Sequence, residues 1–433
     1  MGQGFGFVRG IVERFRAAFQ TSLFRNSFFL LLRSSVNYLL GFLFWLVVAR
    51  WYDDLVMGVG VALLSVVLLL ARGAALGLPS SLLRFLPGER DQNGLINAAI
   101  TAASLIALLI GFVFLLGLDV WTPSVAFVRS DVILTSALLA SVVFFTLDGI
   151  VDNAFVAARR ADYGLVRTSV FYGLRLPLAV GLAAWGLLGI VASWTISLVI
   201  SVAAAALLLP RLFPGYRLRF ALRPLRSRGM IGFSLWTYAT SVVTAASSGV
   251  LPILILSVLG ADVGAITAAH FFAAYAIASL LYGIPQSFST VLVVEGSYAP
   301  MDMGLERRRT VRYSGPLLVA GIAGAIVLGN PILELFGPSF PDSYPALVVL
   351  VLASPILLVT GIFSADLQVE KRARPIFFVA LLSAAVTISV SYVALPVVGT
   401  LGVAAGVIAG QSTRLLMYVV LRRKRIRAMH PIA

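Results

Sequence analysis

Five arginines and two aspartates stand inside apolar stretches of the sequence, where a charged side chain is costly. The arginines are Arg33, Arg72, Arg167, Arg175 and Arg414, and the aspartates are Asp148 and Asp152. On insertion scales, a charge at the centre of a membrane helix costs about 2.5–3.5 kcal/mol, so it usually faces a bundle interior and pairs with another group. These seven residues are therefore the first candidates for a binding site.

Some of these arginines lack an acidic partner nearby in the sequence. Arg33 and Arg72 have no acidic residue within their own apolar stretches, and Asn37 shares a helical face with Arg33. An unpaired guanidinium should meet water or an anion, and its fork matches phosphate oxygens with two hydrogen bonds. We therefore expect a cationic, diphosphate-binding cavity lined by Arg33, Asn37, Arg72, Arg175 and Arg414. The alternative, snorkelling to lipid headgroups, fits Arg33 and Arg414 better than Arg72.

The two aspartates predict ion pairs with arginines on the next helix. Asp148 and Arg175 lie at similar distances from the turn expected after residue 160, so they are level on antiparallel helices. A buried Asp148–Arg175 pair would tie these helices together. Asp152 follows one turn later on the same face, and Arg167 extends the charged strip. Because two adjacent carboxyls resist ionising together, the aspartates are alternatively a proton-responsive pair that drives movement.

The stretches that carry these charges have the length and composition of membrane-spanning helices. The 433-residue chain is 60% hydrophobic and 12% charged, against about 25% charged in a typical soluble domain. A transmembrane helix needs roughly 20 mostly apolar residues. Twelve segments qualify, and they leave no sizeable soluble domain. They lie near residues 28–49, 57–86, 95–118, 131–158, 164–186, 188–210, 230–259, 264–297, 313–337, 344–369, 375–397 and 399–421.

The positions of the basic residues predict the orientation of these helices. Most of the 33 Lys and Arg residues fall in seven groups that alternate with pairs of apolar segments. Since Lys and Arg in short loops mark the cytoplasmic side, both ends of the chain should be cytoplasmic. The net charge of +15 then reflects topology and contact with membrane lipids, and it does not indicate nucleic-acid binding. The chain has no cysteine, which excludes disulfides and thiolate metal sites, and no metal site is predicted.

The chain divides into two halves of six helices each. The second segment contains GLPSSLL and the eighth contains the similar GIPQSFS. The fourth segment ends with GIVDNAFVAARR and the tenth ends with the similar GIFSADLQVEKR. An even number of helices per half makes this a parallel repeat, related by an axis along the membrane normal. Five parts are predicted along the chain. They are a cytoplasmic amphipathic interfacial helix (1–26), an N-lobe (27–210), a basic cytoplasmic linker (211–229), a C-lobe (230–421) and a basic cytoplasmic tail (422–433).

The predicted fold class is thus an all-α polytopic membrane protein with about 12 transmembrane helices in two six-helix lobes. A cavity between two such lobes suits alternating access. Pro79 and Pro285 stand at matched positions of the repeat, within the second and eighth segments. Because proline removes a backbone hydrogen bond, both are candidate hinges, although a static packing kink explains them equally well.

Four longer segments carry a recognisable pattern: ALGLPSSLLRFLP (Ala75–Pro87), AFVAARRADYGLVRTSVFYGLRLPLAV (Ala154–Val180), PILELFGPSFPDSYPALVVLVLA (Pro331–Ala353) and the first hairpin (Arg33–Leu64). These segments resemble the MOP superfamily of multidrug extruders, polysaccharide flippases and lipid II flippases. The sequence is most similar to the polysaccharide-transporter branch of Wzx-type flippases, and the likeness covers nearly the whole chain. It implies a multi-pass protein of the cell membrane with two lobes, which moves polyprenyl-diphosphate-linked oligosaccharide to the external leaflet for surface glycan biosynthesis. Glycan polymerases or ligases are then possible partners, and a monomer is sufficient.

Two other functions stay open. An ion-coupled multidrug antiporter of the MATE type should offer an acidic or aromatic cavity for a cation, whereas the first apolar segment here offers Arg33. A membrane-embedded glycosyltransferase or polymerase could use Asp53 and Asp54 in the first external loop, but the external loops are short and no second acidic cluster accompanies them. We therefore expect a transporter rather than an enzyme. The sequence contains no GxxxxGK[ST] motif, so no cofactor is expected and an H⁺ or Na⁺ gradient is the possible energy source.

Overall fold

The computed structural model describes residues 22–121, 123–222, 228–298, 303–370 and 372–429. All regular elements in these ranges are helices, and no strand occurs among them. Most of the amphipathic helix predicted within 1–26 lies outside the described residues. The predicted all-α membrane fold is confirmed.

The long helices follow the predicted apolar segments closely. Ten of the described helices are long and apolar enough to cross a membrane, or eleven if a bent pair is counted as one span. The helices of the first half are α2 (Ser22–Trp51), α3 (Asp54–Ala74), α4 (Leu78–Phe85), α5 (Gln92–Leu116), α6 (Leu118–Trp121), α7 (Val132–Ala157), α8 (Ala161–Gly181) and α9 (Leu187–Leu212). Those of the second half are α10 (Arg228–Gly249), α11 (Leu251–Leu259), α12 (Ala261–Tyr298), α13 (Met303–Glu334), α14 (Tyr344–Leu352), α15 (Ser354–Val369), α16 (Ala373–Val398) and α17 (Thr400–Met429).

Helix α8 is the remaining predicted span. It is 21 residues long, but Arg167 and Arg175 are buried within it and make it less apolar than its neighbours. With α8 included, the described helices fit the predicted layout of 12 spans in two lobes. The chain is therefore a multi-pass membrane protein.

Three predicted spans are each divided between two helices, α3 and α4, α10 and α11, and α14 and α15. Between α3 and α4 the backbone turns at Leu76 (φ 45°) and Gly77 (φ 71°), a conformation that glycine adopts without strain. Pro79 follows as the second residue of α4, where its missing N–H leaves no hydrogen bond unmade. Pro79 therefore stands at the start of a helix and not within one continuous span, whereas Pro285 lies inside α12. The second break is a bend of 42° between α10 and α11, and the third lies at Ala353, between α14 and α15.

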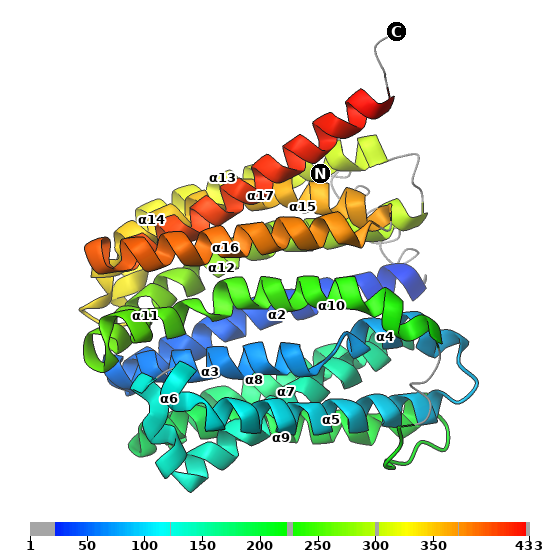
Figure 1. Cartoon of the computed structure of the whole chain (residues 1–433), viewed down its shortest axis with the longest axis horizontal. Coiled ribbons are helices and arrows are strands. Elements are labelled where there is room, and N and C mark those ends of the chain that lie inside the picture. Colours follow the sequence, from blue (N-terminus) through cyan, green and yellow to red (C-terminus); the bar gives the residue numbers. More distant parts are fainter. Residues whose placement is uncertain (1–21, 122, 223–227, 299–302, 371, 430–433) are drawn as a thin grey trace, which may run out of the picture.

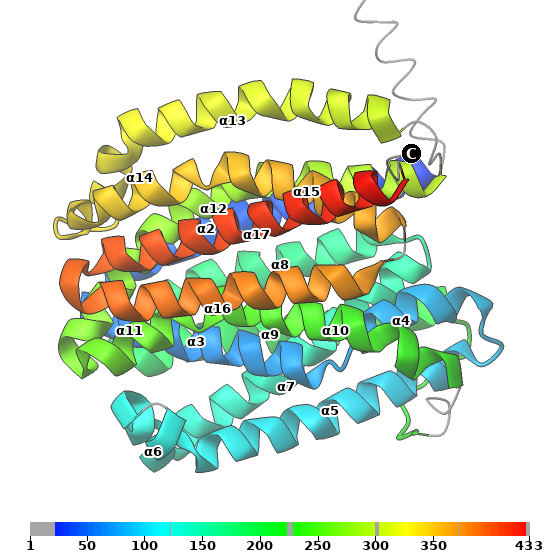
Figure 2. The ribbon, with the colours of Figure 1, turned by 45° about the horizontal axis from the view of Figure 1, so that its top comes forward.

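The two halves form two layers whose helices run roughly parallel (Figure 1). Helices α5, α7, α8 and α9 lie on one side and α13 to α17 lie on the other (Figure 1), and Figure 2 shows α13 and α5 toward opposite faces of the molecule. Helices α2 and α3 of the first half pack against α12 of the second half, and α3 also packs against α10 and α11. The start of α2 and the end of α17 lie at the same end of the bundle, which we call the terminal end and predict to be cytoplasmic.

At the opposite end of the bundle, the far end, the two lobes are in close contact. A Cβ on Gly58 of α3 would overlap the carbonyl oxygen of Ala265 in α12, so the glycine permits this approach. Ser339 Oγ donates to Asp54 Oδ2 at 2.7 Å, and His270 Nε2 lies 3.6 Å from the same oxygen. These contacts between α3 and second-half residues close the space between the lobes at the far end.

The start of the predicted linker packs against helix α5 at the terminal end. Asn97 Nδ2 donates to the carbonyl oxygen of Arg217 at 2.8 Å, and Asn93 Nδ2 donates to that of Pro214 at 3.2 Å. The Tyr216 hydroxyl donates to Asn97 Oδ1 at 3.0 Å. Burial raises the pKa of Tyr216 to about 12, so this phenol keeps its proton at physiological pH. This part of the linker is therefore attached to the first half.

Candidate functional site

A polar cavity of about 310 Å³ lies in the wall of the first lobe, and most of the predicted charged residues line it. Its wall comes from α2, α3, α4, α7 and α8. The side chains that carry its chemistry are Arg33, Asn37 and Tyr38 of α2, Arg72 of α3, Asp148, Asp152 and Asn153 of α7, and Arg167 and Tyr172 of α8. Arg33, Asp152 and Arg167 lie toward the terminal-end parts of their helices. The cavity thus lies nearer the terminal end than the closed far end.

Two ion pairs cross this cavity wall. Arg33 Nη1 donates to Asp152 Oδ2, and Arg167 Nη1 donates to Asp148 Oδ1. The second pair joins adjacent helices, whereas the first brings together α2 and α7, which are 119 residues apart in sequence. Arg167 Nε also lies 3.6 Å from Asp152 Oδ1, and neither of these two atoms has a hydrogen-bond partner among the described residues. The four charges therefore neutralise one another in pairs, with hydrogen-bonding capacity left over.

Arg72 differs from the other cavity arginines because it has no partner. Its side chain is exposed to the cavity, and it makes no ion pair or hydrogen bond with any residue that the structure describes. It lies in the last turn of α3, immediately before the break at Leu76 and Gly77. Its guanidinium can therefore present its N–H groups to a ligand without first losing a carboxylate.

Asn37 and Tyr172 add polar groups to the same wall. The Tyr172 hydroxyl donates to Asn37 Oδ1, which joins α8 to α2. Tyr38 lies at the boundary with the second lobe, since a Cβ on Gly283 of α12 would come within 3.0 Å of its ring. Amide and phenol groups can hydrogen-bond to phosphate oxygens or to sugar hydroxyls.

The structure corrects the expectation for Arg175. This residue is 1% exposed and does not line the cavity. Its guanidinium carbon lies 3.9 Å from the ring centroid of Phe44 and 4.4 Å from those of Tyr172 and Trp194. It does not pair with Asp148, because α8 packs mainly along α2 and α9 and turns this side chain toward their aromatic rings.

Arg414 also lies away from the cavity. It stands on α17, which packs against α14, α15 and α16 on the other side of the molecule from the cavity wall (Figure 1). Four residues later, the buried Tyr418 packs at a tilt against Phe363, so this region belongs to the interior of the second lobe. Arg414 is thus not among the residues that line this cavity, because α17 lies in the other half of the molecule. Of the two candidate hinges, Pro79 lines the cavity.

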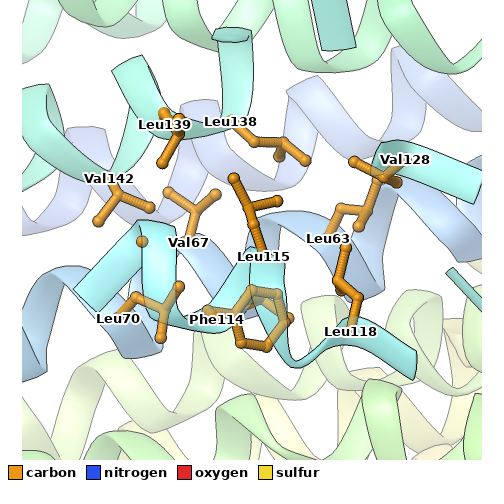
Figure 3. Close-up of a pocket in the computed structure, with 12 residues that line it drawn as sticks. Leu63, Val67, Leu70, Phe114, Leu115, Leu118, Val128, Leu138, Leu139 and Val142 are labelled. Atoms are coloured by element: carbon orange, nitrogen blue, oxygen red, sulfur yellow. The ribbon is translucent and has the colours of Figure 1, made fainter. Parts of the chain in front are cut away.

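A second cavity has no polar lining. It measures about 20 Å³ and lies between α3, α5, α7 and the short helix before α7, lined by Leu63, Leu115, Leu138 and other apolar side chains (Figure 3). An apolar void of this size stays dry and holds no ligand beyond a single small molecule. Among the described residues, no group of three His, Asp or Glu side chains is placed to hold a metal ion.

Sequence reasoning missed the aromatic part of the site. Tyr38, Phe171 and Tyr172 line the cavity, but tyrosine and phenylalanine are common throughout the chain, which has 13 Tyr and 28 Phe. Because these residues are so abundant, the sequence does not indicate which of them line the cavity. The spacing of Tyr172 three residues before Arg175 was the one available signal, because residues three apart on a helix are neighbours.

Comparison with known proteins identifies this fold. No protein-family model matches the chain, and no curated protein matches it in sequence. The fold is similar to "Lipid II flippase MurJ, inward closed conformation" (TM-score 0.75, 14% identity, 90% of this chain and 87% of that chain). It is also similar to an inward-facing multidrug resistance MATE family transporter of the MOP superfamily (TM-score 0.67, 14% identity, 92% and 96%). A MATE protein in complex with MaD5 gives a TM-score of 0.67 at 16% identity, over 96% and 98%.

The chain therefore has the fold of these solved MATE transporters and of the lipid II flippase MurJ, and the sequence resemblance predicted this fold. The likeness extends over about nine-tenths of each chain, so it concerns the fold as a whole. At 14–17% identity it defines the fold, and the polysaccharide branch stays a prediction.

Proposed function

We propose that this protein is a flippase that moves polyprenyl-diphosphate-linked oligosaccharide from the cytoplasmic to the external leaflet by alternating access. The observation that carries this proposal is Arg72, a guanidinium without a partner among the described residues, in a polar cavity at membrane depth. An unpaired cation in such a place favours an anionic ligand over a cationic one. The protein named lipid II flippase MurJ, which has this fold, supports a lipid-linked substrate.

The size of the cavity indicates which part of the substrate it would hold. At about 310 Å³ it is at the lower end of the range of small-ligand pockets, roughly 300–1,000 Å³. That suits a diphosphate with its nearest sugar, whereas a longer glycan has to extend beyond it. We infer that Arg72 binds the diphosphate first, and that Asn37 and Tyr172 then hydrogen-bond to it or to the first sugar.

The ion pairs suggest how binding leads to movement. A diphosphate held by Arg72 competes with Asp152 for the guanidinium of Arg33 across the same cavity. Losing that partner would leave Asp152, which is 5% exposed, as a buried charge, and uptake of a proton would relieve the cost. On this proposal the coupling ion is H⁺ and the aspartate pair carries it.

The contacts between the lobes support an inward-facing state. The far end is closed by the Gly58–Ala265 approach and the Asp54–Ser339 hydrogen bond, and the polar cavity lies toward the terminal end. If the terminal end is cytoplasmic, this is the state that receives a substrate made in the cytoplasm. Rocking of the lobes would open the far end and release it to the external leaflet.

The second candidate is a MATE-type drug antiporter, because several MATE proteins have this fold. The cavity contains two carboxylates, and both are paired with arginines. Among the described residues that line the cavity, no unpaired carboxylate is left to bind a cationic drug. The charges of the cavity thus favour the flippase.

A binding assay separates the two proposals. Purified protein in nanodiscs would be titrated with a polyprenyl-diphosphate oligosaccharide, with the uncharged polyprenol and with a cationic dye. We expect binding of the diphosphate lipid that Arg72→Ala weakens about ten-fold or more, as the loss of a hydrogen bond to a charged group of about 1.5–3 kcal/mol implies. The control is Arg129→Ala, which removes an exposed arginine at the far end. Tight binding of the dye together with no binding of the diphosphate lipid would contradict the proposal.

A further inference from the structure

Arg175 is a buried cation that the cavity mechanism leaves unexplained. Among the described residues no carboxylate lies within ion-pair distance of it, and its Nε and Nη1 atoms have no hydrogen-bond acceptor. Four aromatic rings surround its guanidinium carbon at 3.9–5.0 Å, from Phe44, Phe171, Tyr172 and Trp194. The electron-rich faces of these rings attract the cation, but they carry no net charge that would neutralise it.

The position of this cation relates it to the cavity. Tyr172 is both a wall of the aromatic cage and a wall of the cavity, and its hydroxyl bonds to Asn37. Phe171 likewise lines the cavity and lies in the cage. The guanidinium of Arg175 is therefore one ring away from the cavity, behind its wall.

The charges of the region do not cancel. Arg33 is paired with Asp152, and Arg167 is paired with Asp148. Of the four arginines in or directly behind the cavity wall, Arg72 and Arg175 have no carboxylate partner among the described residues. If the aromatic cage served packing alone, it would not need the charge of Arg175, because an apolar side chain of similar volume would fill the same space without the cost of desolvating a cation.

We propose that Arg175 is a positioning residue whose unpaired charge, acting through the Tyr172 ring, makes the cavity prefer phosphate ligands that carry more negative charge over those that carry less. The proposal rests on the proposed function for the class of ligand, an anionic phosphate headgroup. The guanidinium does not touch the ligand. It acts through its field, which is strong because the protein between it and the cavity excludes water.

The expected size of the effect follows from the distances. The guanidinium carbon is 4.4 Å from the Tyr172 ring centroid, so an anion in contact with the other face of that ring would stand about 8 Å away. For effective dielectric constants of about 20–40, each unit of anionic charge at that distance gains about five- to thirty-fold in affinity. A ligand with one more negative charge therefore gains one more such factor from Arg175.

The test uses two free anions, inorganic phosphate and inorganic pyrophosphate, titrated into the full-length protein in neutral detergent. Calorimetry gives the affinity for each anion in the wild type and in Arg175→Met, and the thermal midpoint is measured alongside. We expect the preference for pyrophosphate over phosphate to fall by about five-fold or more in Arg175→Met. The midpoint should stay unchanged or rise, since a buried unpaired charge has been removed.

A control variant separates the charge from the packing of the cage. Phe44→Leu removes one ring of the cage, 3.9 Å from the guanidinium, and keeps the arginine. It should lower the thermal midpoint and preserve the preference for pyrophosphate. An equal loss of affinity for the two anions in Arg175→Met, an unchanged preference there, or no preference in the wild type would each overturn the proposal.

Failure of the proposed function would look different. If the wild type prefers pyrophosphate and Arg175→Met loses that preference, but no polyprenyl-diphosphate lipid binds or moves, the flippase proposal falls and the role of Arg175 stands. If the lipid is flipped and the preference does not depend on Arg175, the function stands and this inference falls.

Discussion

Removing either partner of the Arg33–Asp152 pair should destabilise the protein, and by unequal amounts. The side chain of Asp152 is 7% exposed, whereas that of Arg33 is 26% exposed to the cavity. Arg33→Gln leaves a buried carboxylate, which costs about 3–5 kcal/mol, toward the lower end because Arg167 Nε lies 3.6 Å from Asp152 Oδ1. Asp152→Asn leaves an arginine that water in the cavity can reach, at a cost of about 1–2 kcal/mol.

A double-mutant cycle measures this asymmetry. Arg33→Gln, Asp152→Asn and the double variant would be unfolded in the same detergent, and we expect the double variant to recover about 1–3 kcal/mol of the summed losses. The control is the Arg129–Asp119 pair, whose side chains are 50% and 57% exposed and which should couple by less than about 1 kcal/mol. Additive losses in the first pair, or a larger loss from Asp152→Asn than from Arg33→Gln, would refute the reasoning.

Three further predictions follow from contacts elsewhere in the molecule. Gly58→Ala should push α3 away from Ala265 and shift the lobes toward opening at the far end, which distances between spin labels on the two lobes would measure. The control is Gly73→Ala on the same helix, whose added methyl group meets nothing within 4 Å and should leave the label distances unchanged. Asp54→Ala removes the acceptor of the Ser339 hydrogen bond and should shift the same equilibrium about five-fold in the same direction; an unchanged label distance would contradict both. Asn97→Ala should release the linker and expose it to limited proteolysis, without changing the affinity for pyrophosphate.

The sequence predicted the helices well because the membrane imposes a simple rule on them. A span must be long and apolar, and each predicted segment corresponds to one helix or to a broken pair of helices. In the second segment a bend was predicted at Pro79, but the backbone breaks a few residues earlier. The structure shows left-handed backbone at Leu76 and Gly77, and Pro79 begins the next helix.

The sequence identified most of the charged residues of the candidate site, but it did not identify which of them pair with one another. Arg33, Arg72, Asp148, Asp152 and Arg167 do meet at one cavity, because charges within apolar helices have to face an interior. Depth along a helix can be counted in residues, but the direction in which a side chain faces depends on how neighbouring helices pack.

The direction in which a side chain faces explains why Arg175 and Arg414 were expected in the cavity but do not line it. Arg175 is level with Asp148 but faces the aromatic rings of α2 and α9, and Arg414 belongs to the other lobe. The far-end contacts of Asp54 with Ser339 and His270 were missed for the same reason. They join parts of the chain that are 285 and 216 residues apart, and no local pattern indicates them.

The central claim is that the protein moves a diphosphate lipid and uses Arg72 to do so. The most direct measurement is translocation of a fluorescent polyprenyl-diphosphate oligosaccharide in proteoliposomes, comparing wild type with Arg72→Ala and with Arg129→Ala as the control. We predict flipping by the wild type and the control, and at least about a ten-fold lower rate in Arg72→Ala. No flipping of any diphosphate lipid by the wild type, with uptake of a cationic dye under an ion gradient instead, would contradict this account.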